Sequence, residues 1–256
     1  MEPGRGLPVA ARCRIPCGVR TVRPYLLWFA AAVLLTFALV RAAEWLRAHP
    51  QHNPYARFEL AHPQGWATHR KLTALVRDDA ACFAAFDRAG ARYERRPVVG
   101  EGVCRASQRM IVAQGGRLPV LSPAAAAPGC AVTAALLLWD RDIVQPLARR
   151  HFGQRVARLD NLGSYNCRRI AGQGAQSEHS TANAIDISAF ILADGTRVSL
   201  LDHWSDTGAK GAFLRDVRDR SCGLFGTLLS PDYNAAHADH FHIDMAVRTA
   251  GWTVCR

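Results

Sequence analysis

Two short segments constrain this chain more than any other part of it, because they combine histidines and carboxylates with a strand-like pattern. The first reads SEHSTANAIDIS over residues 177–188. In its second half, β-branched residues alternate with small or polar ones, which is the period of a half-buried strand. Asp186 is therefore expected to project opposite Ile185 and Ile187. His179 lies seven positions before Asp186, in a polar stretch that can curl back beside the strand.

The second segment reads HADHFHIDM over residues 237–245 and alternates in the same way. His240, His242 and Asp244 are expected to share the polar face of a strand. The opposite, apolar face consists of Phe241, Ile243 and Met245. Histidines left unpaired near a core are costly, so we expect a metal ion or a polar network to hold them.

Imidazole nitrogens and carboxylate oxygens are typical ligands of a tetrahedral zinc ion, and catalytic zinc sites use three protein ligands and one open position. His179, Asp186 and one of His240 or His242 would supply such a set. The residues alone leave the choice between His240 and His242 open, because side chains two positions apart on a strand can converge on one ion.

The first segment also matches a known family pattern. Its spacing Ser177-x-His179-x-x-Ala182-x-Ala184-x-Asp186 resembles the S-x-H-x-x-G-x-A-x-D signature of the LAS metallopeptidases. That family includes D-Ala-D-Ala peptidases and carboxypeptidases, a murein endopeptidase and the Hedgehog signalling domain. Ala182 stands where glycine is usual. The second segment is similar to the murein endopeptidase form of the second motif, in which the last histidine of H-x-H binds zinc.

A more specific resemblance is to the bacterial extensin-like C-terminal family. Besides the SEH of the first segment, it rests on GSYNCR at residues 163–168 and FGTLLSPDYNAAH at residues 225–237. The resemblance covers roughly residues 80–256.

These resemblances imply roles for particular residues. The implied zinc ligands are His179, Asp186 and His242. Asp239 occupies the position of the acidic general base of many LAS peptidases, but aspartate is one methylene shorter than the usual glutamate. His237 or His240 would take that role if Asp239 does not reach. Arg168 and Ser177 are the substrate-binding candidates, and Arg168 lies in a loop similar to the arginine-bearing loop of the carboxypeptidases.

The N-terminus predicts export. Residues 1–23 contain five arginines and precede the apolar run 25–40. Positive charge ahead of an apolar run keeps the N-terminus in the cytoplasm and exports the chain beyond the run. We expect residues 24–43 to form a single-pass anchor in the inner membrane and residues 44–78 a linker or loosely packed lead-in on the periplasmic side. The run has 16 residues, fewer than the roughly 20 that span a bilayer, so secretion after signal cleavage is the alternative.

The net charge of +11 does not indicate nucleic-acid binding. Six arginines and one glutamate fall in the first 41 residues, so five of the eleven charges belong to the N-terminal segment. No nucleic-acid-binding motif accompanies the charge. The expected partners are a cell-wall peptide and, through the N-terminal helix, a membrane.

Residues 79–256 are expected to form one globular domain of the α+β class, with the zinc site on a small antiparallel sheet and helices beside it. The expected helices cover residues 79–86, 130–151 with a bend at Pro146, and 210–222. The expected strands cover residues 110–112, 117–121, 155–162, 187–192, 197–201 and 240–247. The sequence ADGT at residues 193–196 predicts a hairpin turn between two of them.

The eight cysteines divide between two compartments. Cys13 and Cys17 precede the apolar run and would stay reduced in the cytoplasm. The other six would meet an oxidising compartment, and they are Cys82, Cys104, Cys130, Cys167, Cys222 and Cys255. Six cysteines suit three disulfides, and a Cys167–Cys222 pair is favoured because both residues flank the expected active-site loops.

Together these features predict zinc-assisted hydrolysis of a peptide bond in peptidoglycan. The alternative is a non-catalytic module that keeps its zinc and binds the cell wall or a partner, as the Hedgehog domain does within the LAS family. A fold by itself does not decide between them.

Overall fold

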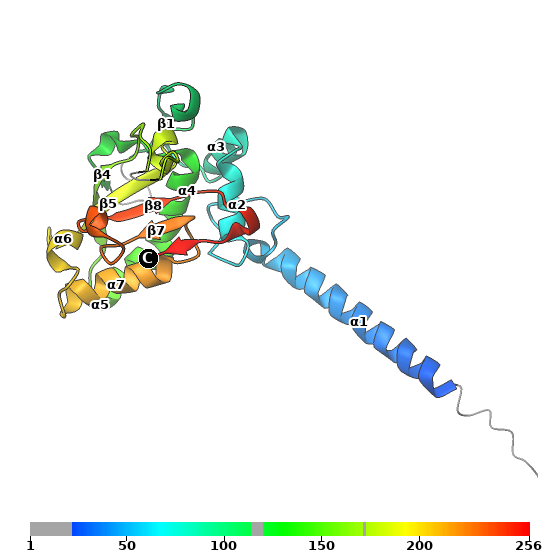
Figure 1. Cartoon of the computed structure of the whole chain (residues 1–256). Helices are drawn as coiled ribbons and strands as arrows, with labels where there is room; N and C mark the ends of the chain where they lie inside the picture. Colours follow the sequence, from blue (N-terminus) through cyan, green and yellow to red (C-terminus); the bar gives the residue numbers. More distant parts are fainter. Residues whose placement is uncertain (1–21, 114–119, 171–172) are drawn as a thin grey trace, which may run out of the picture. The chain divides into compact units, whose positions relative to one another are not determined.

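The computed structural model describes residues 22–113, 120–170 and 173–256. The chain divides into two compact units, Met1–Ala48 and His49–Arg256. The described part of the first unit is one helix, α1 (Val22–Ala48), drawn in blue in Figure 1. Its apolar stretch is long enough to cross a membrane, and none of its most apolar window is buried. Because a core helix would be buried, α1 fits a membrane anchor or a signal sequence, the two alternatives that the sequence predicts.

The second unit mixes helices and strands, which confirms the predicted α+β class. Its α-helices are α2 (Thr68–Leu75), α3 (Asp79–Arg88), α4 (Cys130–Trp139), α5 (Gln145–Phe152), α6 (Leu200–His203) and α7 (Ala209–Ser221). Its strands are β1 (Tyr93–Arg95), β2 (Met110–Val112), β3 (Val120–Ser122), β4 (Val156–Gly163), β5 (Ala184–Leu192), β6 (Arg197–Ser199), β7 (Thr227–Leu229), β8 (Phe241–Asp244) and β9 (Val254–Cys255).

Seven of the described strands form one sheet in the order β3-β4-β5-β8-β7-β9, with β6 paired to β5 beyond the end of β8. The central pairs β4–β5, β5–β8 and β7–β8 are antiparallel, as expected. The outer strands β3 and β9 pair in parallel with β4 and β7. Strands β1 and β2 form a separate antiparallel pair.

Strand β5 carries a bulge that decides which side chains reach the core. Its partner β4 pairs Asn161 with Ile187 and Asp160 with Ala189, so one extra residue lies between these two pairs on β5. A bulge of this kind shifts the alternation by one position. Ile185 and Ile187 before the bulge and Phe190 after it therefore all enter the hydrophobic core. Asp186, between the two isoleucines, faces the other way.

Aromatic side chains from the sheet and from the helices α4 and α7 pack together in the core. The ring of Trp139 on α4 lies 5.7 Å from that of Phe190 and 6.0 Å from that of Phe225. Phe213 on α7 lies 5.2 Å from Phe190. The helices thus cover the face of the sheet that carries Phe190.

The expected continuous helix 130–151 is interrupted. A π-helical turn, Asp140–Val144, separates α4 from α5, and Pro146 lies in the first turn of α5. Proline lacks an N–H group and its ring clashes with the carbonyl four residues earlier, so the preceding turn widens. The break therefore comes before Pro146 instead of at it.

Within the expected linker or lead-in 44–78, residues 44–48 belong to α1 and residues 49–78 to the second unit. Phe58 and Leu60 are buried, and Leu72 on α2 is fully buried in the same core as α4. Lys71 also donates from Nζ to the backbone oxygen of Pro50 at 2.6 Å. The apolar residues of 49–78 show no sustained period because this segment is mostly irregular backbone, with the 3-10 turn Pro50–His52 and the short helix α2. The expected strand 117–121 is described only from Val120 onward, and residues 117–119 lie outside the described ranges.

The six cysteines of the second unit form three disulfides, as predicted, but the favoured pair is wrong. The bonds are Cys82–Cys130, Cys104–Cys167 and Cys222–Cys255. Cys104 lies close to Cys167 because Tyr165, two residues before Cys167, donates from its hydroxyl to the Cys104 carbonyl. Cys255 reaches Cys222 because the C-terminal strand β9 pairs with β7, just after Cys222 in the chain.

Candidate metal centre

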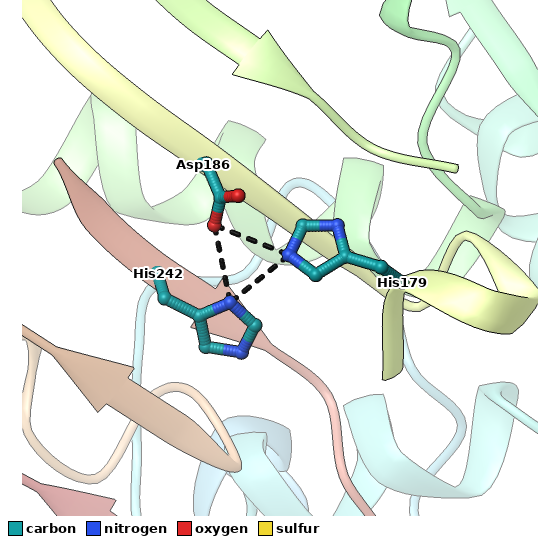
Figure 2. Close-up of side chains that lie close together, drawn as sticks. All are labelled: His179, Asp186 and His242. Atoms are coloured by element: carbon teal, nitrogen blue, oxygen red, sulfur yellow. Dashed lines mark hydrogen bonds and ion pairs between the residues drawn. The ribbon is translucent and has the colours of Figure 1, made fainter. Parts of the chain in front are cut away.

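Three side chains from both sequence segments meet on the face of the sheet opposite the helical core, as Figure 2 shows. Asp186 on β5 and His242 on β8 are direct cross-strand partners. Such partners have Cβ atoms only about 5 Å apart. His179 comes from the 3-10 turn Glu178–Thr181, just before β5.

Their facing atoms form a nearly equilateral triangle. His179 Nε2 lies 3.2 Å from Asp186 Oδ1 and 3.1 Å from His242 Nδ1, and the latter two atoms lie 3.1 Å apart. A tetrahedral zinc ion with bonds of about 2.0 to 2.1 Å separates its ligands by about 3.3 to 3.4 Å. The three atoms are thus spaced nearly as zinc ligands are, at separations that also allow hydrogen bonds between them.

Each histidine ring has one nitrogen that faces the centre and one outer nitrogen. The partner of the outer nitrogen indicates where a neutral ring carries its proton. His179 Nδ1 lies 2.6 Å from the backbone oxygen of Ser164, which can only accept a hydrogen bond. His242 Nε2 lies 3.2 Å from Asp244 Oδ2, and the Asp244 carboxylate also accepts. When both rings are neutral and carry their protons on the outer nitrogens, three lone pairs converge on one point, an arrangement that suits a cation, either a metal ion or a proton.

Asp186 and His242 each shift the pKa of the other. Burial raises the pKa of Asp186, but its close contacts with His179 and His242 outweigh burial and hold that pKa well below its usual range. Burial lowers the pKa of His242, but its contacts with Asp186 and Asp244 raise it to about 9. A proton on His242 is one such cation, since its raised pKa favours the charged ring.

A specific turn presents His179. The buried Ser177 hydroxyl caps the turn by accepting from the His179 N–H at 3.3 Å. Ala182, fully buried, ends the turn with φ of 56°, a left-handed conformation that favours glycine. Contact of Ser177 with a substrate stays a prediction.

His240 and Asp239 form a second pair at the edge of the centre. His240 Nδ1 lies 2.7 Å from Asp239 Oδ1, and His240 Nε2 lies 3.6 Å from Asp186 Oδ1. Asp239 therefore contacts His240 rather than the three facing atoms, and its side chain is half exposed. The structure leaves His240 beside the group of three and places His242 within it.

His237 and Arg168 lie at the rim. His237 Nδ1 donates to Asn234 Oδ1 at 2.7 Å, and its ring lies 5.2 Å from His240 and 5.3 Å from Tyr233. Burial, then the charges of His240 and His242, lower the pKa of His237 to about 4, and Arg168 adds to this effect. Arg168 is exposed, and its charge lies close enough to help lower the pKa of His237.

Two contacts were not predicted from the sequence. Ser164, just after β4, supplies the carbonyl that orients His179, and no side-chain pattern marks a backbone contact. Asp244 contacts the outer nitrogen of His242. Its position two residues after His242, on the same face of the strand, is the signal that could have found it.

Comparison with known proteins places the chain in a family. No curated protein and no solved structure matches it. The family model described as Extensin-like protein C-terminus matches residues 80–256, which include the three facing residues and both rim segments. The chain therefore belongs to the Extensin-like protein C-terminus family.

Proposed function

We propose that this protein is an exported, zinc-dependent peptidase that hydrolyses peptide bonds of peptidoglycan. The observation that carries the proposal is the triangle of His179, Asp186 and His242, whose facing atoms lie 3.1–3.2 Å apart. The similarity of both sequence segments to the LAS metallopeptidase motifs supports the same function. The positive φ of Ala182 at the glycine position of that signature agrees with it.

His179, Asp186 and His242 would hold the metal ion. When bound, zinc lowers the pKa of a water molecule towards about 7 and polarises a carbonyl group. The proton chemistry falls to the chain's own residues. Hydrolysis adds water across the C–N bond, so one proton of the attacking water must be removed and one must reach the leaving amine.

His240 is placed for this transfer. Asp239 accepts from its Nδ1, so Nε2 is left as the atom that can take a proton and give it back. Nε2 also points to the edge of the centre, 3.6 Å from Asp186. We assign the proton transfer to His240 and the orientation of its ring to Asp239. His237, neutral at pH 7 with a pKa near 4, is the second proton acceptor at the rim.

Arg168 would bind the substrate. Its backbone is held to the turn that presents His179, because Ser180 Oγ donates to the Arg168 carbonyl at 2.8 Å. Its exposed guanidinium carries a positive charge beside the centre, which suits a carboxylate or carbonyl of a wall peptide. An exported location, with α1 as anchor or signal, brings the domain to that substrate.

The test is incubation of the purified full-length protein with isolated peptidoglycan, followed by analysis of the released muropeptides. We expect fragments that end at one type of peptide bond, their loss with a chelator, and their return with zinc. The His242→Ala variant should release none, and His203→Ala, which alters a histidine outside the centre, should release as much as wild type. Zinc-loaded wild-type protein that binds peptidoglycan but releases no fragment would refute the peptidase and favour a non-catalytic wall-binding module.

A further inference from the structure

The ring of His242 lies between two carboxylates. Its Nδ1 is 3.1 Å from Asp186 Oδ1, and its Nε2 is 3.2 Å from Asp244 Oδ2. Asp244 is only 4% exposed. Its other oxygen, Oδ1, accepts from the backbone N–H of Ala246 at 2.9 Å. Both oxygens of Asp244 are therefore engaged, one on the backbone and one on the ring.

Backbone atoms of neighbouring segments pack closely around Asp244. On β8, Asp244 is two residues after His242 and pairs with Ala184 of β5 and Thr227 of β7. Gly226, before β7, donates to the Asp244 carbonyl at 2.8 Å. A Cβ atom at Gly226 would lie 2.6 Å from backbone atoms of Ala246 and 3.1 Å from Asp244 Oδ1. The fold thus packs bare backbone against this carboxylate.

A buried carboxylate is costly unless a positive or donating group compensates it. The compensating groups of Asp244 among the described residues are the Ala246 N–H and the His242 ring. A carboxylate that accepts from Nε2 keeps the proton on that nitrogen and leaves Nδ1 as an acceptor. The Ser164 carbonyl has the same effect on His179. It accepts from Nδ1 and so leaves Nε2 as an acceptor.

We propose that Asp244 is a positioning residue that holds His242 in the tautomer and ring orientation in which Nδ1 binds the metal ion. This inference rests on the metal-binding part of the proposed function and not on peptidase activity. Residues that orient metal-binding histidines typically change metal affinity by about 10 to 100-fold when mutated.

Asp239 offers a matched control. It also accepts from a histidine ring on the same segment, but from His240, which lies outside the group of three facing residues. The test variants are Asp244→Asn and Asp239→Asn, both nearly isosteric. Asparagine at 244 has only one acceptor oxygen, so it cannot serve both the Ala246 N–H and His242 Nε2.

Zinc affinity of the full-length proteins is measured by competition with a chromophoric chelator. We expect Asp244→Asn to bind zinc about 10 to 100-fold more weakly, and Asp239→Asn to match wild type within about twofold because its partner is not a ligand. Equal affinity of Asp244→Asn and wild type overturns the proposal, and so does an equal loss in both variants, which would indicate a general charge effect. Wild-type protein that binds no zinc overturns it too, together with the metal centre. Zinc binding without peptidase activity would contradict the proposed peptidase function and leave the role of Asp244 in metal binding intact.

A second measurement needs no variant and is independent of folding effects. Nitrogen NMR of labelled histidine rings in the zinc-loaded wild-type protein should show one metal-binding ring with its proton on Nε2, for His242, and one with its proton on Nδ1, for His179. Two metal-binding rings that both carry the proton on Nδ1 would contradict the role of Asp244.

Discussion

At the scale of single residues, the centre depends on which atoms face one another rather than on which residues are near. His240 and His242 are both buried and both border Asp186, yet only His242 closes the triangle with His179. His240 has its Nδ1 on Asp239 and its Nε2 slightly farther from Asp186, at 3.6 Å. This difference separates the proposed metal ligand from the proposed proton carrier.

The first prediction concerns the ligands. Removal of one of three protein ligands leaves too few donors, so His242→Ala should lose nearly all stoichiometric zinc. His240→Ala should keep it, because its ring is outside the triangle. Elemental analysis of the purified variants checks this. Full zinc in His242→Ala and none in His240→Ala would show that His240, and not His242, is the ligand.

The second prediction concerns turnover. Groups that transfer protons typically contribute about 10² to 10⁴-fold in rate. His240→Ala should therefore lower kcat by that order while zinc content and the melting temperature stay near wild type. Asp239→Asn should have a smaller effect, since it acts only through His240. Muropeptide release over time, normalised to bound zinc, measures both, and an unchanged kcat in His240→Ala would remove it from the mechanism.

The third prediction concerns a buried acid far from the centre in the sequence. Asp140, 2% exposed in the π-helical turn, accepts from Gln145 Nε2 at 2.9 Å. Burial raises its pKa from 3.8 to about 7. Between these values the folded protein holds a proton that the unfolded chain has lost. The free energy of unfolding should therefore fall with rising pH, by up to about 1.4 kcal/mol per unit, and level off above pH 7.

Asp140→Asn removes this titration, since asparagine does not ionise. Thermal unfolding of both proteins, followed by tryptophan fluorescence at pH 5 and pH 8, checks the sign. The melting temperature of the variant should decline less than that of wild type over this range. Identical declines would show that Asp140 does not hold its proton in the folded state.

At the scale of elements, β5 and β8 carry the centre on one face and the core on the other. Ile243 lies between His242 and Asp244 in sequence, but its side chain is fully buried on the opposite face. The bulge of β5 and the apolar residues of both strands pin the register that sets Asp186 opposite His242. Packing of the core and geometry of the site are thus coupled through two strands.

The fourth prediction tests the packing of the core face of β8. Ile243→Ala should lower the free energy of unfolding by about 2 to 5 kcal/mol, because it leaves a cavity in the core. Leu201→Ala, an equally large truncation at a side chain that is 65% exposed, should change it by less than about 0.5 kcal/mol. Urea unfolding of the full-length proteins in detergent measures both. A small loss in Ile243→Ala would show that this face of β8 is poorly packed.

At the scale of the whole molecule, three disulfides connect segments that are distant in sequence. Cys82–Cys130 joins α3 to α4, Cys104–Cys167 joins the loop before β2 to the loop after β4, and Cys222–Cys255 joins the end of α7 to β9. Each loop that a disulfide closes removes entropy from the unfolded chain. The second bond also anchors the loop that carries Arg168.

The fifth prediction combines these bonds with export. Peptide mapping of protein from membranes, without reduction, should find these three pairs and no Cys167–Cys222 peptide. Six alkylated thiols at these positions would place the domain in a reducing compartment and contradict export. A reporter fused after Arg256 gives an independent check, since it should be active only on the far side of the membrane from the N-terminus.

Features that depend on local pattern could be predicted from the sequence alone. Alternation placed Asp186 and His242 on polar strand faces, and the arginine-flanked apolar run marked α1. Local patterns also located the helices α3 and α7, the short strand β2 and the β5–β6 hairpin. These patterns act within a few residues, so no tertiary information is needed to recognise them.

Which distant residues meet was settled by tertiary packing instead. The pairing of Cys167 with Cys104, the burial of Leu72 and the contact of Asp244 with His242 Nε2 all depend on strand order, loop paths and ring orientation. The β5 bulge, which returns Phe190 to the core, likewise follows from pairing with β4 and β6. Contacts of this kind arise from packing between elements, and a single sequence does not record which elements become neighbours.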